Sequence, residues 1–390
     1  MYVTRPRSVY HRFPGALSLQ PQADVPYSGQ LVVTDEESEA MDSFCCGIWR
    51  DHKINRLPFP SDRVLQVVHS SLQEEAGVIK AWFVPVLDQP LSSNRYYVIK
   101  AKGRRKGQAY TCSREGDVGM CCWRRSRVES KTRPFDHRDR YQQLEIRPFH
   151  GGGFCARSVE WDGYPPSFLS RGGWEVYKAP SCRFHLHEEA GGLLPTPPLG
   201  FPDRDLPLNA RRSTPVVVGR WYCPCVMVRE DGMRAAEQMR KCMVYEVSLK
   251  QWWEQIHSVE NEGGGEDGVV VDARVRRVVC RALGMEAEKE DGAADGFVWF
   301  RGKGECRRRV GVGLSLSLYE KMRWVQETRG WFDGEREVRV KGSKEVGSGS
   351  GWTRFGCYVL VESFVLRRMD GSLLINFNFR NTDKIVCKWE

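Results

Sequence analysis

The cysteines are the first residues of this 390-residue chain that could carry chemistry. Cys223-Pro-Cys225 resembles half of a zinc site, but such a site needs a second ligand pair. Cys242 and Cys280 could supply that pair only if the fold happened to bring them together. Residues two apart in a strand share a face, so both thiols can equally point into one core. We therefore predict no metal site.

Two other cysteine pairs, Cys45-Cys46 and Cys121-Cys122, are adjacent in the chain. Neighbouring cysteines cannot readily chelate one tetrahedral ion, which disfavours zinc here as well. Cys121 and Cys122 precede Trp123 and two arginines, and these surroundings are compatible with reversible acylation. We treat palmitoylation of Cys121 and Cys122 as a hypothesis, beside the simpler interpretation that they are buried thiols.

The histidines offer two incomplete catalytic patterns. His150, followed by three glycines, matches the oxyanion element of esterases, but the chain has no G-x-S-x-G nucleophile elbow. His185 and His187 could both ligate a metal from one strand, yet the spacing places no third ligand. A P-loop and a dinucleotide-binding fingerprint are also absent. We predict neither a catalytic residue nor a cofactor.

Positive charge is concentrated in one segment. The formal net charge is +9, and residues 100–140 hold 13 Lys or Arg against 5 Asp or Glu, a net +8. The sequence GRRKG at 103–107 lies between two strand-like runs, which predicts a hairpin with a basic tip. Such a tip could bind nucleic-acid phosphates or acidic lipid headgroups, and KGRRK resembles a nuclear-import patch. A merely solvated loop is the alternative. The candidate anion-binding residues are Lys102, Arg104, Arg105, Lys106, Arg124, Arg125 and Arg127.

The elements that would position these residues fall into two halves. Six prolines between Pro195 and Pro215 predict a linker over 191–215. It would join an N-terminal lobe, 1–190, to a C-terminal lobe, 216–390. Short runs rich in Val, Ile, Tyr and Phe predict strands throughout the N-terminal lobe. These runs are 64–68, 78–87, 95–102 and 108–112.

The C-terminal lobe shows both strand and helix patterns. Alternating residues predict strands at 269–276 and 372–380, and Asp370-Gly371 predicts a hairpin turn before the second. Capping-box patterns at Ser248 and Ser317 predict two helices, and 235–241 suggests a third. We therefore expect an α+β fold, with a β-rich N-terminal lobe and a mixed α+β C-terminal lobe of two or three helices.

Composition excludes several classes of protein. Apolar residues make up 41% and charged residues 28%, which is typical of a globular chain rather than a disordered one. The mean hydropathy of −0.49 argues against a transmembrane span. Because no apolar region opens the chain, we expect no secretory signal, and we expect the 14 cysteines to be free thiols.

Four stretches together resemble one family. They are MYVTRP at 1–6, QPLSSNRYYV at 89–98, VVVGRWYCP at 216–224, and MDGSLL at 369–374 with KWE at 388–390. The chain resembles the plant family of domain-of-unknown-function 1262. The resemblance implies an uncharacterised plant protein, of a kind sometimes labelled insecticidal-crystal-toxin-like and associated in part with stress or defence. The resemblance implies no catalytic or binding residue at any position of this chain. Cys225 stands where the family pattern implies an aromatic residue.

The sequence thus favours a non-enzymatic interaction or binding protein of the plant cytoplasm or nucleus, acting in stress or defence. One alternative is peripheral membrane or nucleic-acid binding through residues 100–140. A second alternative is an enzyme with an unrecognised site. The partner expected for the basic segment is anionic, either nucleic acid or acidic lipid.

Overall fold

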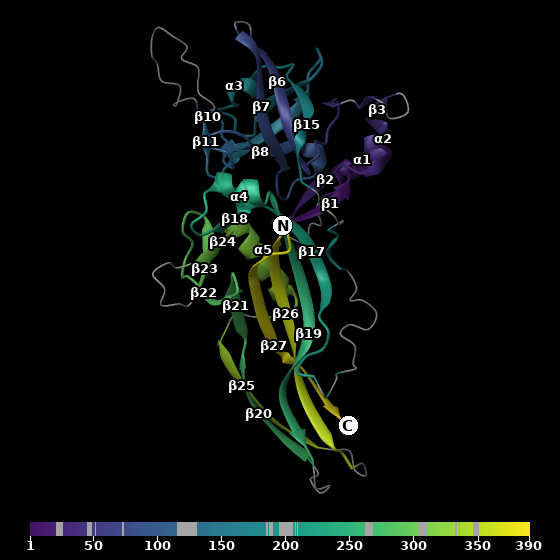
Figure 1. The fold of residues 1–390 in the computed structure, drawn as a ribbon, viewed down its shortest axis with the longest axis vertical. Coiled ribbons are helices and arrows are strands. Elements are labelled where there is room, and N and C mark those ends of the chain that lie inside the picture. Colours follow the sequence, from purple (N-terminus) through teal and green to yellow (C-terminus); the bar gives the residue numbers. More distant parts are fainter. Residues whose placement is uncertain are drawn as a thin grey trace. The chain divides into compact units, whose positions relative to one another are not determined.

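The fold is that of a computed structural model (Figure 1). It describes residues 1–20, 26–44, 49–50, 52–71, 74–114, 131–184, 186, 190–194, 206, 208, 210–261, 268–302, 310–331, 334, 336–345 and 351–390. The chain divides into two compact units. The first comprises Met1–Ala190 with Tyr222–Val244, and the second comprises Gly191–Trp221 with Tyr245–Glu390.

The first unit is built around a mainly antiparallel sheet with the strand order β11-β9-β8-β7-β6-β15-β5, and β12 pairs with both β8 and β13. Short apolar stretches separated by Gly, Pro and Asn turns give these strands, as expected of such a pattern. Their bounds are β5 Lys53–Ile54, β6 Arg63–Ser71, β7 Glu74–Pro85, β8 Arg95–Lys100, β9 Ala109–Tyr110, β11 Thr132–Arg133, β12 Gln143–Pro148, β13 Phe154–Ser158 and β15 Glu175–Arg183.

Smaller elements complete the first unit. A parallel pair, β1 with β2, carries α1 and α2 between and after its strands. The bounds are β1 Tyr2–Pro6, α1 Arg7–Arg12, β2 Gly29–Val33, α2 Glu36–Met41, β3 Ser43–Phe44, β4 Trp49–Arg50, β10 Ser113–Arg114, β14 Gly163–Tyr164, α3 Ser167–Ser170, β18 Val228–Glu230 and α4 Ala235–Lys241. Single 3-10 turns lie at Pro14–Ser18, Leu91–Ser93, Arg140–Gln142 and Cys225–Met227.

Aromatic side chains form the centre of the first unit's core. Phe59 is fully buried, and its ring centroid lies 4.9 Å from those of both Phe83 and Phe154. Tyr96 and Trp174 belong to the same cluster, and the Tyr96 hydroxyl accepts a hydrogen bond from the Phe59 amide at 3.2 Å. Truncating such a buried ring typically costs about 3–5 kcal/mol, so this cluster holds the hairpins of the sheet together.

The second unit is a long antiparallel sheet with the strand order β24-β23-β22-β21-β27-β26-β19-β17. Figure 1 shows β19, β26 and β27 running alongside one another as long strands. The bounds are β16 Gly192–Leu193, β17 Val216–Pro224, β19 Val244–Glu260, β21 Val278–Ala282, β22 Met285–Lys289, β23 Phe297–Gly302, β24 Gly311–Ser315, β26 Arg354–Arg368 and β27 Leu373–Trp389.

Two further elements lie against this sheet. Helix α5, Leu316–Thr328, begins at Ser315, whose hydroxyl accepts a hydrogen bond from the Leu318 amide. A separate ribbon pairs β20, Gly268–Arg276, with β25, Glu337–Glu345. Val269 and Val271 of β20 pack into an apolar cluster with Phe355 of β26, so the ribbon is held to the sheet by its inward-facing side chains.

The expectation of an α+β fold with a mixed C-terminal lobe is wrong: the chain is mostly β. The five α-helices within the described ranges have 6, 6, 4, 7 and 13 residues. Strands form the body of both units, and both large sheets are predominantly antiparallel. No described helix combines the length and the apolar composition needed to cross a membrane.

The main source of this error is the segment beginning at Ser248. The spacing of Leu249, Trp252 and Ile256 predicts a helix, but the segment lies in β19 and pairs with β26 over most of its length. Residues on both faces of β19 are buried, so its apolar pattern lacks the alternation of a half-exposed strand. Its aromatic and β-branched residues favour the extended conformation once a partner strand is present.

Other predictions for the second half of the chain are confirmed. Helices form at 235–241 and at Leu316–Thr328, and Gly330, with a φ of +86°, follows the end of α5. The second helix begins earlier than predicted: its cap is Ser315, and Ser317 lies inside the first turn. The hairpin at Asp370-Gly371 joins β26 to β27. In β20, Val269, Val271 and Val275 are buried while Asp272 and its charged neighbours are exposed. These patterns are local, which is why the sequence suffices to predict them.

Candidate anion-binding surface

The basic tip predicted at 103–107 is a tight turn between β8 and β9. We call residues 102–107 the basic turn. The Lys100 amide donates to the Gln108 carbonyl at 2.8 Å, and the Gly107 amide donates to the Lys100 carbonyl at 2.8 Å. Gly103 and Gly107 have φ values of +87° and +84°, which glycine adopts without a steric cost. The two glycines thus let the chain reverse over a short distance and project the cations between them.

The side chains of the basic turn point mostly into solvent. Lys102, Arg104 and Arg105 are exposed, and Lys106 is half-buried. Of the ion pairs between described residues, none involves Lys102, Arg104 or Arg105. Three unneutralised charges within one turn raise the local positive potential, which attracts anions over about one Debye length, ~8 Å at physiological salt.

Helix α4 lies directly against this turn, within the first unit. A Cβ placed on Gly107 would lie 3.0 Å from the carbonyl oxygen of Ala235, the first residue of α4. Arg234, Arg240 and Lys241 are exposed around this short helix, and Glu237 is the acidic residue among them. A seven-residue helix is only about 10 Å long, so Arg234 adjoins the contact with the turn, and Arg240 and Lys241 follow within about one helix length of it.

Sequence reasoning missed the contribution of α4. More than a hundred residues separate α4 from the basic turn, and no local pattern predicts their contact. The sequence predicts a helix at 235–241, and the cations in and beside it are the only local signal. We call the exposed cations of the turn and of α4 together the basic surface; they are Lys102, Arg104, Arg105, Arg234, Arg240 and Lys241.

The rest of the predicted basic segment is only partly described. Arg124, Arg125 and Arg127 lie outside the described residues, as do Cys121 and Cys122, and their roles stay predictions. Strand β11 pairs Arg133 with Ala109, two residues after Gly107, and leaves the Arg133 side chain exposed.

The thiols of Cys223 and Cys225 are buried in the first unit, and Cys242 lies near enough to interact electrostatically with both. Burial raises the pKa of Cys223 to about 12 and also raises that of Cys225. Metal binding requires thiolates, and a raised pKa disfavours them at neutral pH. Cys280 belongs to the second unit. Within the described part of the chain, no group of three or more His, Cys, Asp or Glu side chains is arranged to hold a metal ion.

The histidine patterns form no catalytic constellation in the residues that can be described. His150 is exposed in the turn between β12 and β13, where Gly152 and Gly153 have φ values of +92° and +73°. The turn closes through a 3.0 Å hydrogen bond from the Phe149 amide to the Gly153 carbonyl. His185 and His187 lie outside the described residues.

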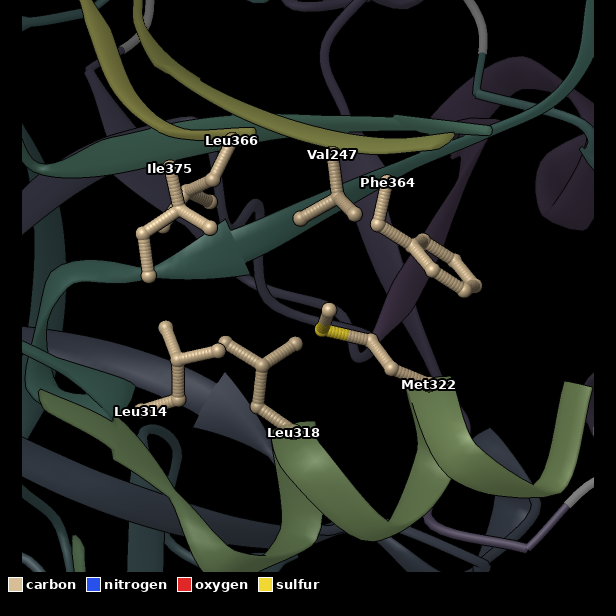
Figure 2. Close-up of a pocket in the computed structure, with 7 residues that line it drawn as sticks. All are labelled: Val247, Leu314, Leu318, Met322, Phe364, Leu366 and Ile375. Atoms are coloured by element: carbon tan, nitrogen blue, oxygen red, sulfur yellow. The ribbon is translucent and has the colours of Figure 1, made fainter. Parts of the chain in front are cut away.

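A cavity in the second unit lies between α5 and the sheet (Figure 2). Leu318 and Met322 of α5 face Val247, Phe364 and other apolar side chains of the sheet, as Figure 2 shows. The cavity has a volume of about 10 Å³, and its lining is entirely apolar. Apolar cavities of this size stay dry, so we interpret it as a packing gap rather than a ligand site.

One family model agrees in part with the resemblance found in the sequence. Residues 24–123 match the family model described as "Protein of unknown function (DUF1262)", which supports that family assignment for this part of the chain. No curated protein matches the chain by sequence. A solved structure described as "Crystal structure of Cry35Ab1" is similar to this one at a TM-score of 0.45 and 11% sequence identity. The similarity covers 85% of this chain and 90% of that one.

Proposed function

We propose that this chain is a non-enzymatic binding protein that engages a phosphate-bearing partner through the basic surface. The observation that carries the proposal is the presence of Lys102, Arg104 and Arg105 on one turn closed by backbone hydrogen bonds, exposed and without an ion pair among the described residues. Charges held on a tight turn lose less conformational freedom on binding than charges on a flexible loop. The adjacent α4 extends the surface with three more cations.

The setting of this function is proposed from the family resemblance. The protein would act in the plant cytoplasm or nucleus, in a stress or defence response. Imaging of a fluorescent fusion in plant cells, before and after stress, tests the location. A signal confined to the cell wall or to a secretory compartment would contradict it.

The binding proposal is tested with matched charge variants of the full chain. The test variant is Lys102→Gln/Arg104→Gln/Arg105→Gln, in the basic turn. The control is Arg274→Gln/Arg281→Gln/Lys341→Gln, which removes the same charge from exposed positions of the second unit. The probes are a duplex DNA and vesicles containing phosphatidylserine, each titrated over a series of salt concentrations.

We expect the wild type to bind at least one probe with an affinity that falls as salt rises. For duplex DNA the logarithmic slope changes by about 0.9 per phosphate contact, so the turn variant should lose a slope of up to about 3. The control variant should bind as the wild type does. Equal binding by the turn variant and the control would contradict the proposal. Binding to only one of the two probes would identify the kind of partner.

A further inference from the structure

Two cysteines face each other across the longest hairpin of the second unit. Cys357 of β26 lies directly opposite Cys387 of β27 in the antiparallel register. Both are free thiols, Cys357 buried and Cys387 half-buried. They share an apolar cluster with Phe355 and Trp389, whose ring centroids lie 4.4 Å apart. The two thiols therefore lie on one face of the sheet, at neighbouring positions.

The hydrogen-bond pattern shows which kind of cross-strand pair this is. Arg354 and Glu390 exchange two backbone hydrogen bonds, of 3.1 and 2.9 Å, so they form a hydrogen-bonded pair. Opposed pairs alternate between hydrogen-bonded and non-hydrogen-bonded along an antiparallel ladder. The register continues from Phe355 opposite Trp389 to Cys357 opposite Cys387 without a shift. Cys357 and Cys387 are therefore a non-hydrogen-bonded pair.

This position brings the two sulfurs within bonding range of each other. In non-hydrogen-bonded pairs the Cα atoms lie about 4.5 Å apart, and the side chains approach closely. Disulfides span Cα separations of about 4.4–6.8 Å, so a bond could form here without moving the strands. The separation is at the short end of that range, where a disulfide is strained and more easily reduced.

The surroundings make one of the two thiols the better nucleophile. A hydrogen bond from Cys357 lowers the pKa of Cys387, and the positive charge of Lys344 on β25 acts in the same direction. The same hydrogen bond raises the pKa of Cys357, which keeps its proton. Cys387 is also the more exposed of the two. Cys387 is the more accessible thiol and the one favoured as a thiolate, so it is suited to attack. Cys357 is buried and protonated, so it is suited to resolve the mixed disulfide that this attack forms.

We propose that Cys357 and Cys387 form a reversible redox site, which closes to an intrachain disulfide on reaction with a small disulfide such as oxidised glutathione. The Cys387 thiolate attacks one glutathione sulfur, which breaks the glutathione disulfide and releases one glutathione thiolate. Cys357 then loses its proton to solvent and attacks the Cys387 sulfur, which releases the second glutathione. The protein dithiol is oxidised, and one oxidised glutathione is reduced to two thiols. The site is independent of the basic surface.

The experiment uses the full reduced chain, equilibrated without oxygen in glutathione buffers of increasing oxidised fraction. The samples are quenched with acid and unfolded, the free thiols are alkylated, and the peptides are mapped by mass spectrometry. We expect a linked peptide pair containing Cys357 and Cys387, with both sites becoming protected together. Dithiothreitol should reverse the linkage. In the urea-unfolded chain, Cys387 should lose its preference for Cys357.

Single variants separate the roles of the two thiols. In Cys357→Ser, Cys387 can still attack oxidised glutathione, but no second thiol can resolve the mixed disulfide. We therefore expect this mixed disulfide on Cys387 to accumulate at least about tenfold above the wild type. In Cys387→Ser we expect Cys357 to stay a free thiol. Cys280→Ser, a buried cysteine of β21, should react as the wild type does. The proposal is overturned if both thiols of the folded wild type stay open to alkylation in the most oxidising buffer. It is equally overturned if Cys387 pairs there with a different cysteine.

Discussion

Gly107, at the end of the basic turn, packs against the backbone of Ala235 at the start of α4. A Cβ added at position 107 would lie 3.0 Å from the Ala235 carbonyl oxygen and 3.2 Å from its carbonyl carbon. Because a backbone group cannot rotate away as a side chain can, a Cβ at this position would push the start of α4 away by a few tenths of an ångström. The contact fixes the turn that carries Arg104 and Arg105 relative to the helix that carries Arg240.

This contact predicts different costs for two alanine substitutions in the same turn. Gly103→Ala carries only the strain of a positive φ, about 1–2 kcal/mol, because the nearest atom to its Cβ would be Lys100 Cε at 3.9 Å. Gly107→Ala carries the same strain and must also displace α4, so we expect a loss about 1 kcal/mol larger. Urea unfolding of both variants measures the difference. Equal losses would mean that α4 does not restrain the turn.

The basic turn could be predicted from sequence, whereas its partner helix could not. Two glycines around a cluster of cations, between two strand-like runs, are a local pattern that specifies a turn. The meeting of Gly107 with Ala235 depends on how distant segments pack, and neither residue type signals it. Sequence reasoning therefore found the cations of the basic turn and missed those of α4.

The pairing of Cys357 with Cys387 is a second feature that could not be predicted from the sequence. Near the turn at Asp370-Gly371, Leu366 pairs with Ile375. If this register continued unchanged along the hairpin, Lys384 would lie opposite Cys357. A register shift between Val359 and Leu360 moves the pairing and brings Cys387 there instead. Such an irregularity inserts extra residues into one strand, and the turn sequence does not encode it.

A buried ion pair between α5 and the sheet gives a further prediction. The Glu362 side chain has no exposed surface; it accepts hydrogen bonds from Gln251 on β19 and from Arg329, just after α5. Arg329→Met would leave the carboxylate buried without its cation, at a cost of about 3 kcal/mol in unfolding free energy. Glu362→Gln combined with Arg329→Met should cost less than Arg329→Met alone, since no unpaired charge remains.

The matched control for the Arg329 variant is Arg323→Met. Arg323 pairs with Glu327 one helical turn away at 2.6 Å, but both side chains are substantially exposed. Such a pair contributes only about 0.3–0.5 kcal/mol. Chemical denaturation of the variants distinguishes the two cases. A similar small loss for both would show that Glu362 is solvated in the folded protein.

Stability at low pH should depend on the carboxylate that begins α2. Burial tends to raise the pKa of Asp35, but hydrogen bonds from Ser8 and Ser38 outweigh it and lower that pKa below 3.8. The Ser38 amide donates to Asp35 at 2.7 Å, as in a normal helix N-cap. Because the folded pKa is depressed, the stabilisation by this charge is fully present above about pH 4. It is lost as the pH falls through the folded value.

Two substitutions at Asp35 separate charge from capping. Asp35→Ala should destabilise the chain by about 1 kcal/mol at pH 7, because the cap is lost. Asp35→Asn keeps an acceptor oxygen for the Ser38 amide and should lose less. The advantage of the wild type over Asp35→Asn should shrink as the pH falls below 4, measured by thermal unfolding at several pH values. A constant difference between these two proteins down to pH 2 would contradict the depressed pKa.

The rate at which Cys387 is alkylated should follow its pKa. Only the thiolate reacts with iodoacetamide, and the lowered pKa of Cys387 makes more of it reactive near neutral pH than of an ordinary cysteine. The buried Cys280, whose pKa is raised to about 12, should stay unreactive in the folded chain over the same range. Site-resolved mass spectrometry at a series of pH values gives both profiles. In Cys357→Ala the hydrogen bond to the thiolate is absent, so the Cys387 midpoint should rise toward the ordinary cysteine value of about 8.5. A midpoint that this substitution leaves unchanged would show that Cys357 does not stabilise the Cys387 thiolate.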